Sequence, residues 1–196
     1  MKLLYGSMLM NTTGIEVRKM DDLMLDLETL GTSPDCVVVQ IGACYFDSTT
    51  GEIGEEFRVN IDIDSCLREG FTVGGDTLKW WLTEQAKNAT FFNNTTNVRA
   101  AICDFIEFSW NARRVWSHAT FDFIVIMNYI NRLEYTPGFG FRSARDIRTL
   151  LDLSGLEIKP NKNNAPRAGE HDALRDCVYQ VGYCVKALKK LGKRHA

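Results

Sequence analysis

Residues 22–30 read Asp-Leu-Met-Leu-Asp-Leu-Glu-Thr-Leu, and this stretch decides the fold. Three leucines alternate with Met24, Asp26 and Glu28, which is the period of a β-strand. One face of the strand is therefore apolar, whereas both acids leave it on the other face. Two carboxylates so placed repel each other and resist burial, and a hard divalent cation such as Mg²⁺ or Mn²⁺ relieves both costs. Taken alone, the pair is also compatible with a solvated strand face.

Two further strands are predicted immediately after this one. Residues 37–46 are rich in β-branched side chains, and residues 55–63 alternate again. Turn-forming residues at 31–34 and 48–51 separate the three strands. Short connections of this kind predict an antiparallel meander.

From Gly74 onward the hydrophobic period becomes helical, and helices alternate with short strands. Asp76 or Thr77 is the expected cap of the first helix and Thr120 that of the third. The expected helices are 77–87, 97–111, 121–133, one from about residue 150, and 172–191, with short strands at 114–117 and within 143–149. This order predicts an α/β fold with a mixed five-stranded sheet flanked by helices.

The length and charge of the chain narrow its class. With 196 residues it has enough material for one domain, expected at 21–196, preceded by a flexible leader at 1–20. The formal net charge of −2 argues against a protein that coats duplexes non-specifically, since such proteins are strongly basic. A nucleic-acid enzyme with a local basic rim remains compatible with this charge.

The cysteines and the hydropathy pattern predict a cytoplasmic protein. No two of the six cysteines form a C-x-x-C pair, so we interpret them as reduced core thiols. No apolar run approaches the roughly 20 residues that a membrane span needs.

Three further polar residues could join the acids of the first strand. Asp122 lies in the first turn of a predicted helix, where the helix dipole alone would favour an acid. His171 precedes the last helix and Asp176 lies one turn inside it. A loop histidine beside bound water can act as a general base, although a surface position would also explain each residue.

Taken together, these residues resemble the motifs of a known superfamily. Asp26-x-Glu28, then Phe121-Asp122, then His171-x-Ala173-x-x-Asp176 follow the order found in the DEDD exonucleases. The histidine in the third motif resembles the DEDDh, or DnaQ-like, branch, which implies an RNase H-like fold.

The resemblance implies both a reaction and a cofactor. Asp26, Glu28, Asp122 and Asp176 would hold two Mg²⁺ or Mn²⁺ ions, and His171 would take a proton from the attacking water. All five are therefore candidate catalytic residues. Stepwise cleavage from a 3′ end would release 5′-mononucleotides.

Two extra segments resemble a narrower subfamily that includes T-even phage exonuclease A and a mycobacterial exoribonuclease. They are residues 77–81 and 145–149. The phage likeness favours DNA as the substrate, with RNA close behind. The substrate contacts that we expect are the backbone amides of Leu30 and Gly31, the side chains of Trp80 or Trp81, and the arginines Arg148 and Arg167.

Two residues near the motifs are assigned other roles. Asp172 is interpreted as the N-cap of the last helix, and His118 as a structural residue or a substrate contact. The predicted function is a metal-dependent 3′–5′ exonuclease of single-stranded DNA or RNA that could form a homodimer. The rivals are a catalytically silent binding protein on the same fold and a proofreading subunit that needs a polymerase.

Overall fold

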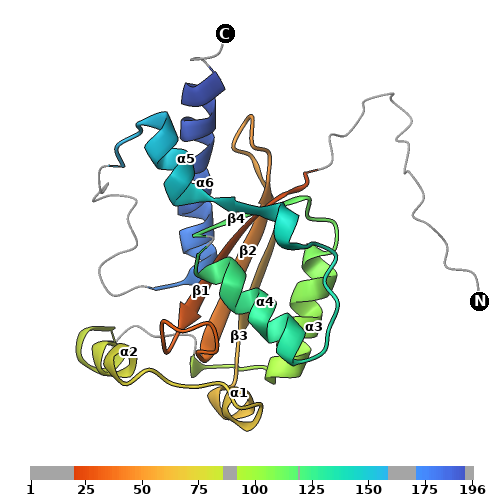
Figure 1. Cartoon of the computed structure of the whole chain (residues 1–196), viewed down its shortest axis with the longest axis vertical. Helices are drawn as coiled ribbons and strands as arrows, with labels where there is room; N and C mark the ends of the chain where they lie inside the picture. Colours follow the sequence, from red (N-terminus) through yellow and green to blue (C-terminus); the bar gives the residue numbers. More distant parts are fainter. Residues whose placement is uncertain (1–19, 86–91, 119, 159–170, 193–196) are drawn as a thin grey trace, which may run out of the picture.

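The computed structural model contains a central sheet with helices on both sides (Figure 1). The residues that it describes are 20–85, 92–118, 120–158 and 171–192. The predicted leader at 1–20 lies outside them except for Met20, and the predicted contact Arg167 lies outside them entirely. Within the described residues, no helix is long and apolar enough to cross a membrane.

The sheet is mixed and five-stranded, as predicted. Strands β1 (Asp22–Thr29), β2 (Val38–Phe46) and β3 (Ile53–Asn60) form the antiparallel meander. Strands β4 (Arg114–Ser117) and β5 (Ala144–Asp146) extend the other side of β1 in parallel, which gives the order β3-β2-β1-β4-β5. Strand β1 therefore lies at the centre, where both of its faces are covered.

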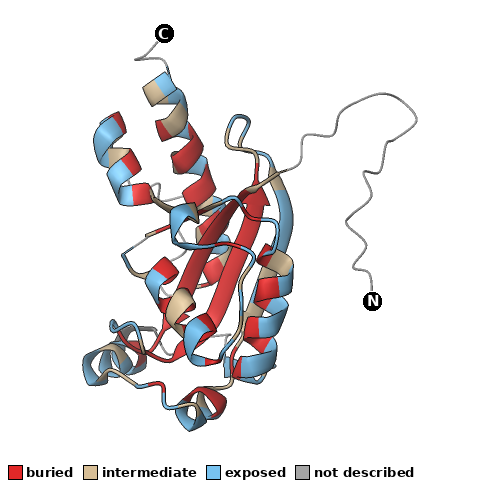
Figure 2. Ribbon diagram, turned by 45° about the vertical axis from the view of Figure 1, so that its right-hand side comes forward, coloured by how far each residue is buried: buried red, intermediate tan, exposed pale blue. Residues whose placement is uncertain are grey.

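Helices account for most of the remaining described residues. They are α1 (Ile63–Arg68), α2 (Gly75–Trp80), the π-helical turn η1 (Trp81–Gln85), α3 (Val98–Ser109), α4 (Asp122–Arg132), the 3₁₀ turn η3 (Phe141–Ser143), α5 (Ile147–Ser154) and α6 (Ala173–Gly192). Burial concentrates in the sheet and in the helix faces turned toward it (Figure 2).

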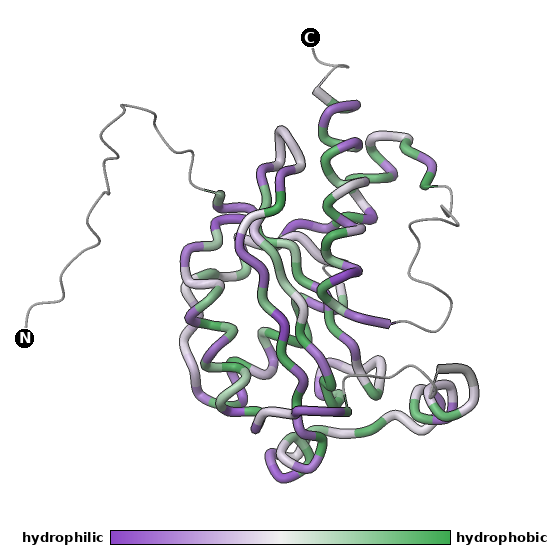
Figure 3. Tube along the Cα trace, turned by 180° about the vertical axis from the view of Figure 1, so that it is seen from behind, coloured by the Kyte–Doolittle hydropathy of each residue, from purple (hydrophilic) through white to green (hydrophobic). Residues whose placement is uncertain are grey.

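The alternation in β1 divides the interior into two cores. Leu23 and Leu25 face the core built with α3 and α4, whereas Met24 faces the core built with α5 and α6. Seen from behind, hydrophobic and hydrophilic residues are interspersed along α6, as an amphipathic helix requires (Figure 3). Because Asp26 and Glu28 follow Met24 at intervals of two, they lie on the α6 side.

Two residues of β2 hold the start of α6 against the sheet. The Ala173 amide donates to Gln40 Oε1 at 2.7 Å, which satisfies one of the free N–H groups at the helix start. Gly42 lies beneath this turn, where a Cβ atom would fall 2.2 Å from the Ala173 carbonyl carbon. The Cys177 thiol completes the contact by donating to the Gly42 carbonyl at 3.2 Å.

The middle of the chain differs from the prediction in two places. Strand β3 ends at Asn60, and a short helix, α1, begins where the strand was expected to continue. It forms because Asp62 caps it, accepting from the Asp64 amide. The helix expected from residue 77 begins at Gly75 and changes to a π-helical turn at Trp81.

Several predicted caps are also corrected. Gly74 is the N-cap of α2 without a side-chain hydrogen bond, so neither Asp76 nor Thr77 serves as its cap. Phe121 is the N-cap of α4, again without one, which removes that role from Thr120.

Two other predictions need correction. Helix α5 begins at Ile147 rather than near Leu150, because the Asp146 carboxylate accepts from the amides of the two residues after Ile147. All six cysteines are free thiols, but Cys103 is exposed on α3 and is not a core residue.

Candidate active site

The acids of β1 are buried at the carboxyl end of the strand. Asp26 is 9% exposed and Glu28 is 7% exposed. Both lie on the face that α6 covers, as the alternation predicts. The third acid, Asp122, begins α4 and is 2% exposed. Asp176 lies in the first turn of α6, and His171 lies two residues before that helix.

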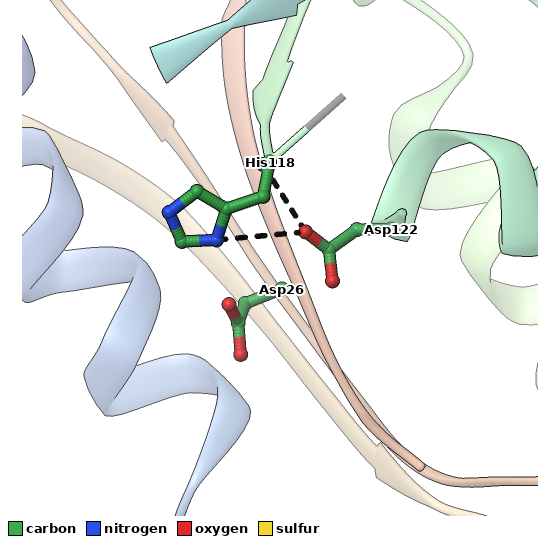
Figure 4. Close-up of side chains that lie close together, drawn as sticks. All are labelled: Asp26, His118 and Asp122. Carbon is green, nitrogen blue, oxygen red and sulfur yellow. Dashed lines mark hydrogen bonds and ion pairs between the residues drawn. The ribbon is translucent and has the colours of Figure 1, made fainter. Parts of the chain in front are cut away.

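These side chains divide into two groups of possible metal ligands. Asp26, His118 and Asp122 form one group, and Glu28, His171 and Asp176 form the other. Within each group the three ligand atoms lie within 4.8 Å of one another. Figure 4 shows the first group, with the His118 ring directed toward Asp122 and with Asp26 beside them. The four predicted carboxylates therefore converge from β1, α4 and α6.

Burial makes these carboxyl groups reluctant to ionise. Burial first, and the charges of the neighbouring acids second, raise the pKa of Asp26 well above its ordinary value. The same causes raise the pKa of Glu28 to about 8 and that of Asp176 to about 6. Burial also raises the pKa of Asp122 to about 7, although backbone hydrogen bonds oppose the shift. A cation within the cluster would remove this cost.

Gln180 holds Asp26 in place, and sequence reasoning missed it. Its Nε2 donates to Asp26 Oδ1 at 2.7 Å, and both groups are buried. Gln180 lies one turn after Asp176 on the same face of α6. That spacing was the available signal, but an amide one turn beyond an acid is too common to stand out.

His118 is the second residue whose place in the site was missed. It was expected to be structural or to contact substrate, yet its ring lies in the first ligand group. Its main-chain amide also donates to Asp122 Oδ2 at 3.1 Å. The available signal was its spacing: His118 directly follows β4, two residues after Trp116, whose side chain packs in the core that α6 helps to form.

His171 is packed beside two indole rings. The ring centroids of Trp80 and Trp81 lie 5.2 and 5.3 Å from its own, each with its edge toward a face. Its Nδ1 lies 3.9 Å from Glu28 Oε1. Burial lowers the pKa of His171, so the imidazole is neutral at neutral pH and able to accept a proton.

The two tryptophans predicted as alternative substrate contacts have different environments. Trp81 is 4% exposed, and its Nε1 donates to the Thr29 carbonyl at 2.9 Å, so it belongs to the core. Trp80 is 40% exposed beside His171. Of the pair, Trp80 is the one with an accessible ring.

The other predicted substrate contacts are distributed around this cluster. The Leu30 amide already donates to the Val37 carbonyl at 2.8 Å, which leaves the Gly31 amide as the expected contact. Arg148 is exposed on α5. Its charge opposes the rise that burial causes in the pKa of Asp122 and adds to the fall that burial causes in the pKa of His118, which places it near the first group.

Asp172 has the structural role that the sequence suggested. Its Oδ1 accepts from the Arg175 amide at 3.1 Å, as an N-cap does at the start of α6. Its Oδ2 accepts from Arg58 at 2.9 Å. Both carboxylate oxygens are therefore engaged, and Asp172 is not in either ligand group among the described residues.

The sheet order and the carboxylate cluster define the class of the RNase H-like exonuclease domains. The model of one family, described as the 3′-5′ exoribonuclease Rv2179c-like domain, matches residues 21–188. The chain belongs to this family. Membership confirms the predicted resemblance to 3′–5′ exonucleases, while the likeness to the phage enzyme stays a prediction.

Solved structures of exonuclease I share the fold. The E. coli enzyme in complex with a dT13 oligonucleotide has a TM-score of 0.63 and 15% sequence identity, covering 89% of this chain and 42% of its own. The E. coli enzyme with a dA16 oligonucleotide has a TM-score of 0.58 and 17% identity, covering 86% and 40%. This chain thus spans about two fifths of those proteins. No curated protein sequence matches it significantly.

Proposed function

We propose that this chain is a metal-dependent 3′–5′ exonuclease that releases 5′-mononucleotides from single-stranded nucleic acid. The observation that carries the proposal is the convergence of four carboxylates, three of them buried and that of Asp176 half-buried, in two groups that each include an imidazole. Family membership supports the same activity. A silent binding protein would not need to gather four mutually repelling acids at a largely buried site, which argues against that rival.

The residues present fit a divalent cation. Asp26, Glu28, Asp122 and Asp176 supply carboxylate oxygens, the ligands that Mg²⁺ and Mn²⁺ prefer, and burial raises the pKa of each, a cost that a bound cation would offset. Two groups of ligands suit two ions. Bound there, Mg²⁺ or Mn²⁺ would supply Lewis acidity toward the phosphate and toward the attacking water.

His171 is the proposed general base. It is neutral at neutral pH, and its Nδ1 faces Glu28 within the second group, so that nitrogen can accept the proton of the attacking water. The edges of two indole rings limit how the imidazole can turn. A base held in this way needs no reorientation before it accepts the proton.

Other residues would position the substrate. The accessible ring of Trp80 lies beside His171, where it can stack on the terminal base of a single strand. Arg148 would contact a phosphate, and the Gly31 amide would approach the last nucleotide. We expect the Trp80→Ala variant to raise KM more than it lowers kcat.

The sugar is a separate part of the proposal. The likeness to the phage exonuclease favours DNA, and the similar folds that hold dT13 and dA16 are consistent with that choice. The matching family is described as an exoribonuclease domain. Its model matches residues 21–188, a far longer stretch than the two short segments that resemble the phage subfamily. We therefore place single-stranded RNA first and DNA second.

The test is digestion of matched 5′-labelled RNA and DNA of one sequence with Mg²⁺, Mn²⁺ or EDTA. We expect a ladder that shortens from the 3′ end and that EDTA abolishes, with the faster substrate identifying the sugar. The Asp26→Asn variant, purified in parallel, controls for contaminating nuclease. Immediate release of the labelled 5′ nucleotide, or cleavage that survives EDTA, would contradict the proposal.

A further inference from the structure

The position of His118 follows from the pairing of two parallel strands. Met24 of β1 lies opposite Trp116 of β4, and both side chains face α6. Two residues after Met24 comes Asp26, still within β1, and two residues after Trp116 comes His118, which directly follows the end of β4. Side chains two apart share a face, so the strand geometry itself brings this imidazole to the side of the first carboxylate.

The ring is also held at a short distance from the third acid. His118 Nδ1 lies 3.9 Å from Asp122 Oδ2, and its main-chain amide donates to the same oxygen (Figure 4). The His118 side chain is 28% exposed, whereas that of Asp122 is 4% exposed. Nδ1 and the main-chain nitrogen of His118 thus both face the same carboxylate oxygen of Asp122. An ion among these three ligand atoms, all within 4.8 Å of one another, would meet nitrogen as well as oxygen.

We propose that His118 is a metal ligand, donating Nδ1 to the ion that Asp26 and Asp122 would hold. The inference rests on the proposed function, because it concerns one of the two cation positions of that site. An imidazole ligand changes the preference of the position, since Mg²⁺ favours oxygen ligands and imidazole is a common ligand of transition-metal ions. This position therefore prefers Mn²⁺ over Mg²⁺, while the group of Glu28 and Asp176 keeps His171 for proton transfer.

The test uses Mn²⁺ alone as the probe, without substrate. Calorimetric titration should show that His118→Gln weakens Mn²⁺ binding by at least the roughly 10–100-fold that is typical for loss of an outer-shell partner. The same variant should lose less affinity for Mg²⁺ than for Mn²⁺. Pulsed electron paramagnetic resonance of the Mn²⁺-loaded protein should show a nitrogen coupling that disappears in the same variant.

Matched variants make the assignment specific. His171→Gln and His195→Gln remove the other two histidines of the chain and should leave the nitrogen coupling in place. His118→Asn provides a second substitution if His118→Gln fails to fold, as judged by circular dichroism. A coupling that persists without His118, or that vanishes only without His171, overturns the proposal. So does Mn²⁺ binding of unchanged affinity, or no Mn²⁺ binding to the unsubstituted protein.

Failure of the proposed function has a different signature. If Mn²⁺ binds with a nitrogen coupling from His118 but neither RNA nor DNA is cleaved, the ligand assignment stands and the exonuclease proposal fails. If RNA or DNA is cleaved but the nitrogen coupling is absent, the exonuclease proposal stands and the assignment of His118 as a metal ligand fails. The two conclusions are therefore decided by separate measurements.

Discussion

At the scale of single residues, the site combines acids that resist ionisation with an imidazole that stays neutral. Asp26 and Glu28 could be placed on one face of the strand from the alternation of β1 alone, whereas their burial could not be predicted from it. Gln180 and His118 could not, because their roles depend on which strand and which helix face lie beside β1. That information is tertiary, and local periodicity does not contain it.

The base role of His171 gives the first prediction. We expect His171→Ala to lower kcat by roughly 10²–10⁴ with little change in substrate affinity, because a positioned general base contributes about this much. Steady-state kinetics on the preferred substrate would measure both quantities, with His171→Asn as a polar control. An unchanged kcat would move the proton transfer to another group.

Glu28 gives a prediction about pH and stability in the metal-free protein. Its pKa is about 8 in the folded protein, mainly through burial, against an ordinary value of 4.5. Between these values the folded state binds more protons than the unfolded chain, so stability falls as the pH rises. We expect the Tm in EDTA to decrease from about pH 4.5 to about pH 8.

The control for this effect is Glu28→Gln, which removes the ionisable group while keeping its shape. Near pH 8 its Tm should exceed that of the unsubstituted protein, and its Tm should fall less steeply as the pH rises. The buried neighbours, Asp26 and Asp122, leave some slope in place. A Tm that rises with pH in EDTA would contradict the account.

At the scale of secondary-structure elements, the site depends on how closely α6 approaches β2. Gly42 permits this approach, and Gln40 fixes the first turn of the helix. The sequence predicted both elements, β2 from its β-branched side chains and α6 from its helical hydrophobic period. It did not predict α1 or the π-helical turn, since both are short and the Asp62 cap of α1 resembles an ordinary strand residue.

Gly42→Ala tests the contact between these two elements. Its Cβ would lie 2.2 Å from a backbone carbon of Ala173, so α6 must move. We expect a loss of about 1–3 kcal/mol in the free energy of unfolding, as for other overpacked sites, together with reduced activity because Asp176 moves with the helix. Chemical denaturation and the digestion assay measure the two effects.

Gly182→Ala is the matched control for that substitution. Gly182 lies on the exposed side of α6, and nothing lies within 4 Å of the Cβ that would be added. Alanine there should stabilise the helix by roughly 0.5–1 kcal/mol, because glycine is a poor helix former. If both variants behave alike, the close approach at Gly42 does not control the position of α6.

At the scale of the whole molecule, the fold gathers the candidate site from three distant parts of the chain. The antiparallel meander and the mixed five-stranded sheet with flanking helices followed from the pattern of strands and helices. The grouping of ligands did not, because the order of motifs along the chain says nothing about which acid lies beside which. The resemblance to a family identified the motifs along the chain, and the fold showed which of their side chains lie together.

Divalent ions should stabilise this assembly as a whole. An ion that binds only the folded state at about 100 times its Kd contributes about 2.7 kcal/mol. We therefore expect Mn²⁺ and Mg²⁺ to raise the Tm at neutral pH, measured by differential scanning calorimetry. The Asp26→Asn variant should respond much less. An equal rise in that variant would mean that the ions bind elsewhere.

The hydrogen bond between Gln180 and Asp26 joins residues 154 positions apart in the sequence. A ribosome delivers β1 long before it delivers α6, so a growing chain carries its first two acids without their partners. The complete set comes together only after residue 180 has left the exit tunnel and α6 has docked. Under the proposed function, an unfinished chain therefore lacks the complete set of ligands, and the capacity to cleave nucleic acid arises only late in synthesis.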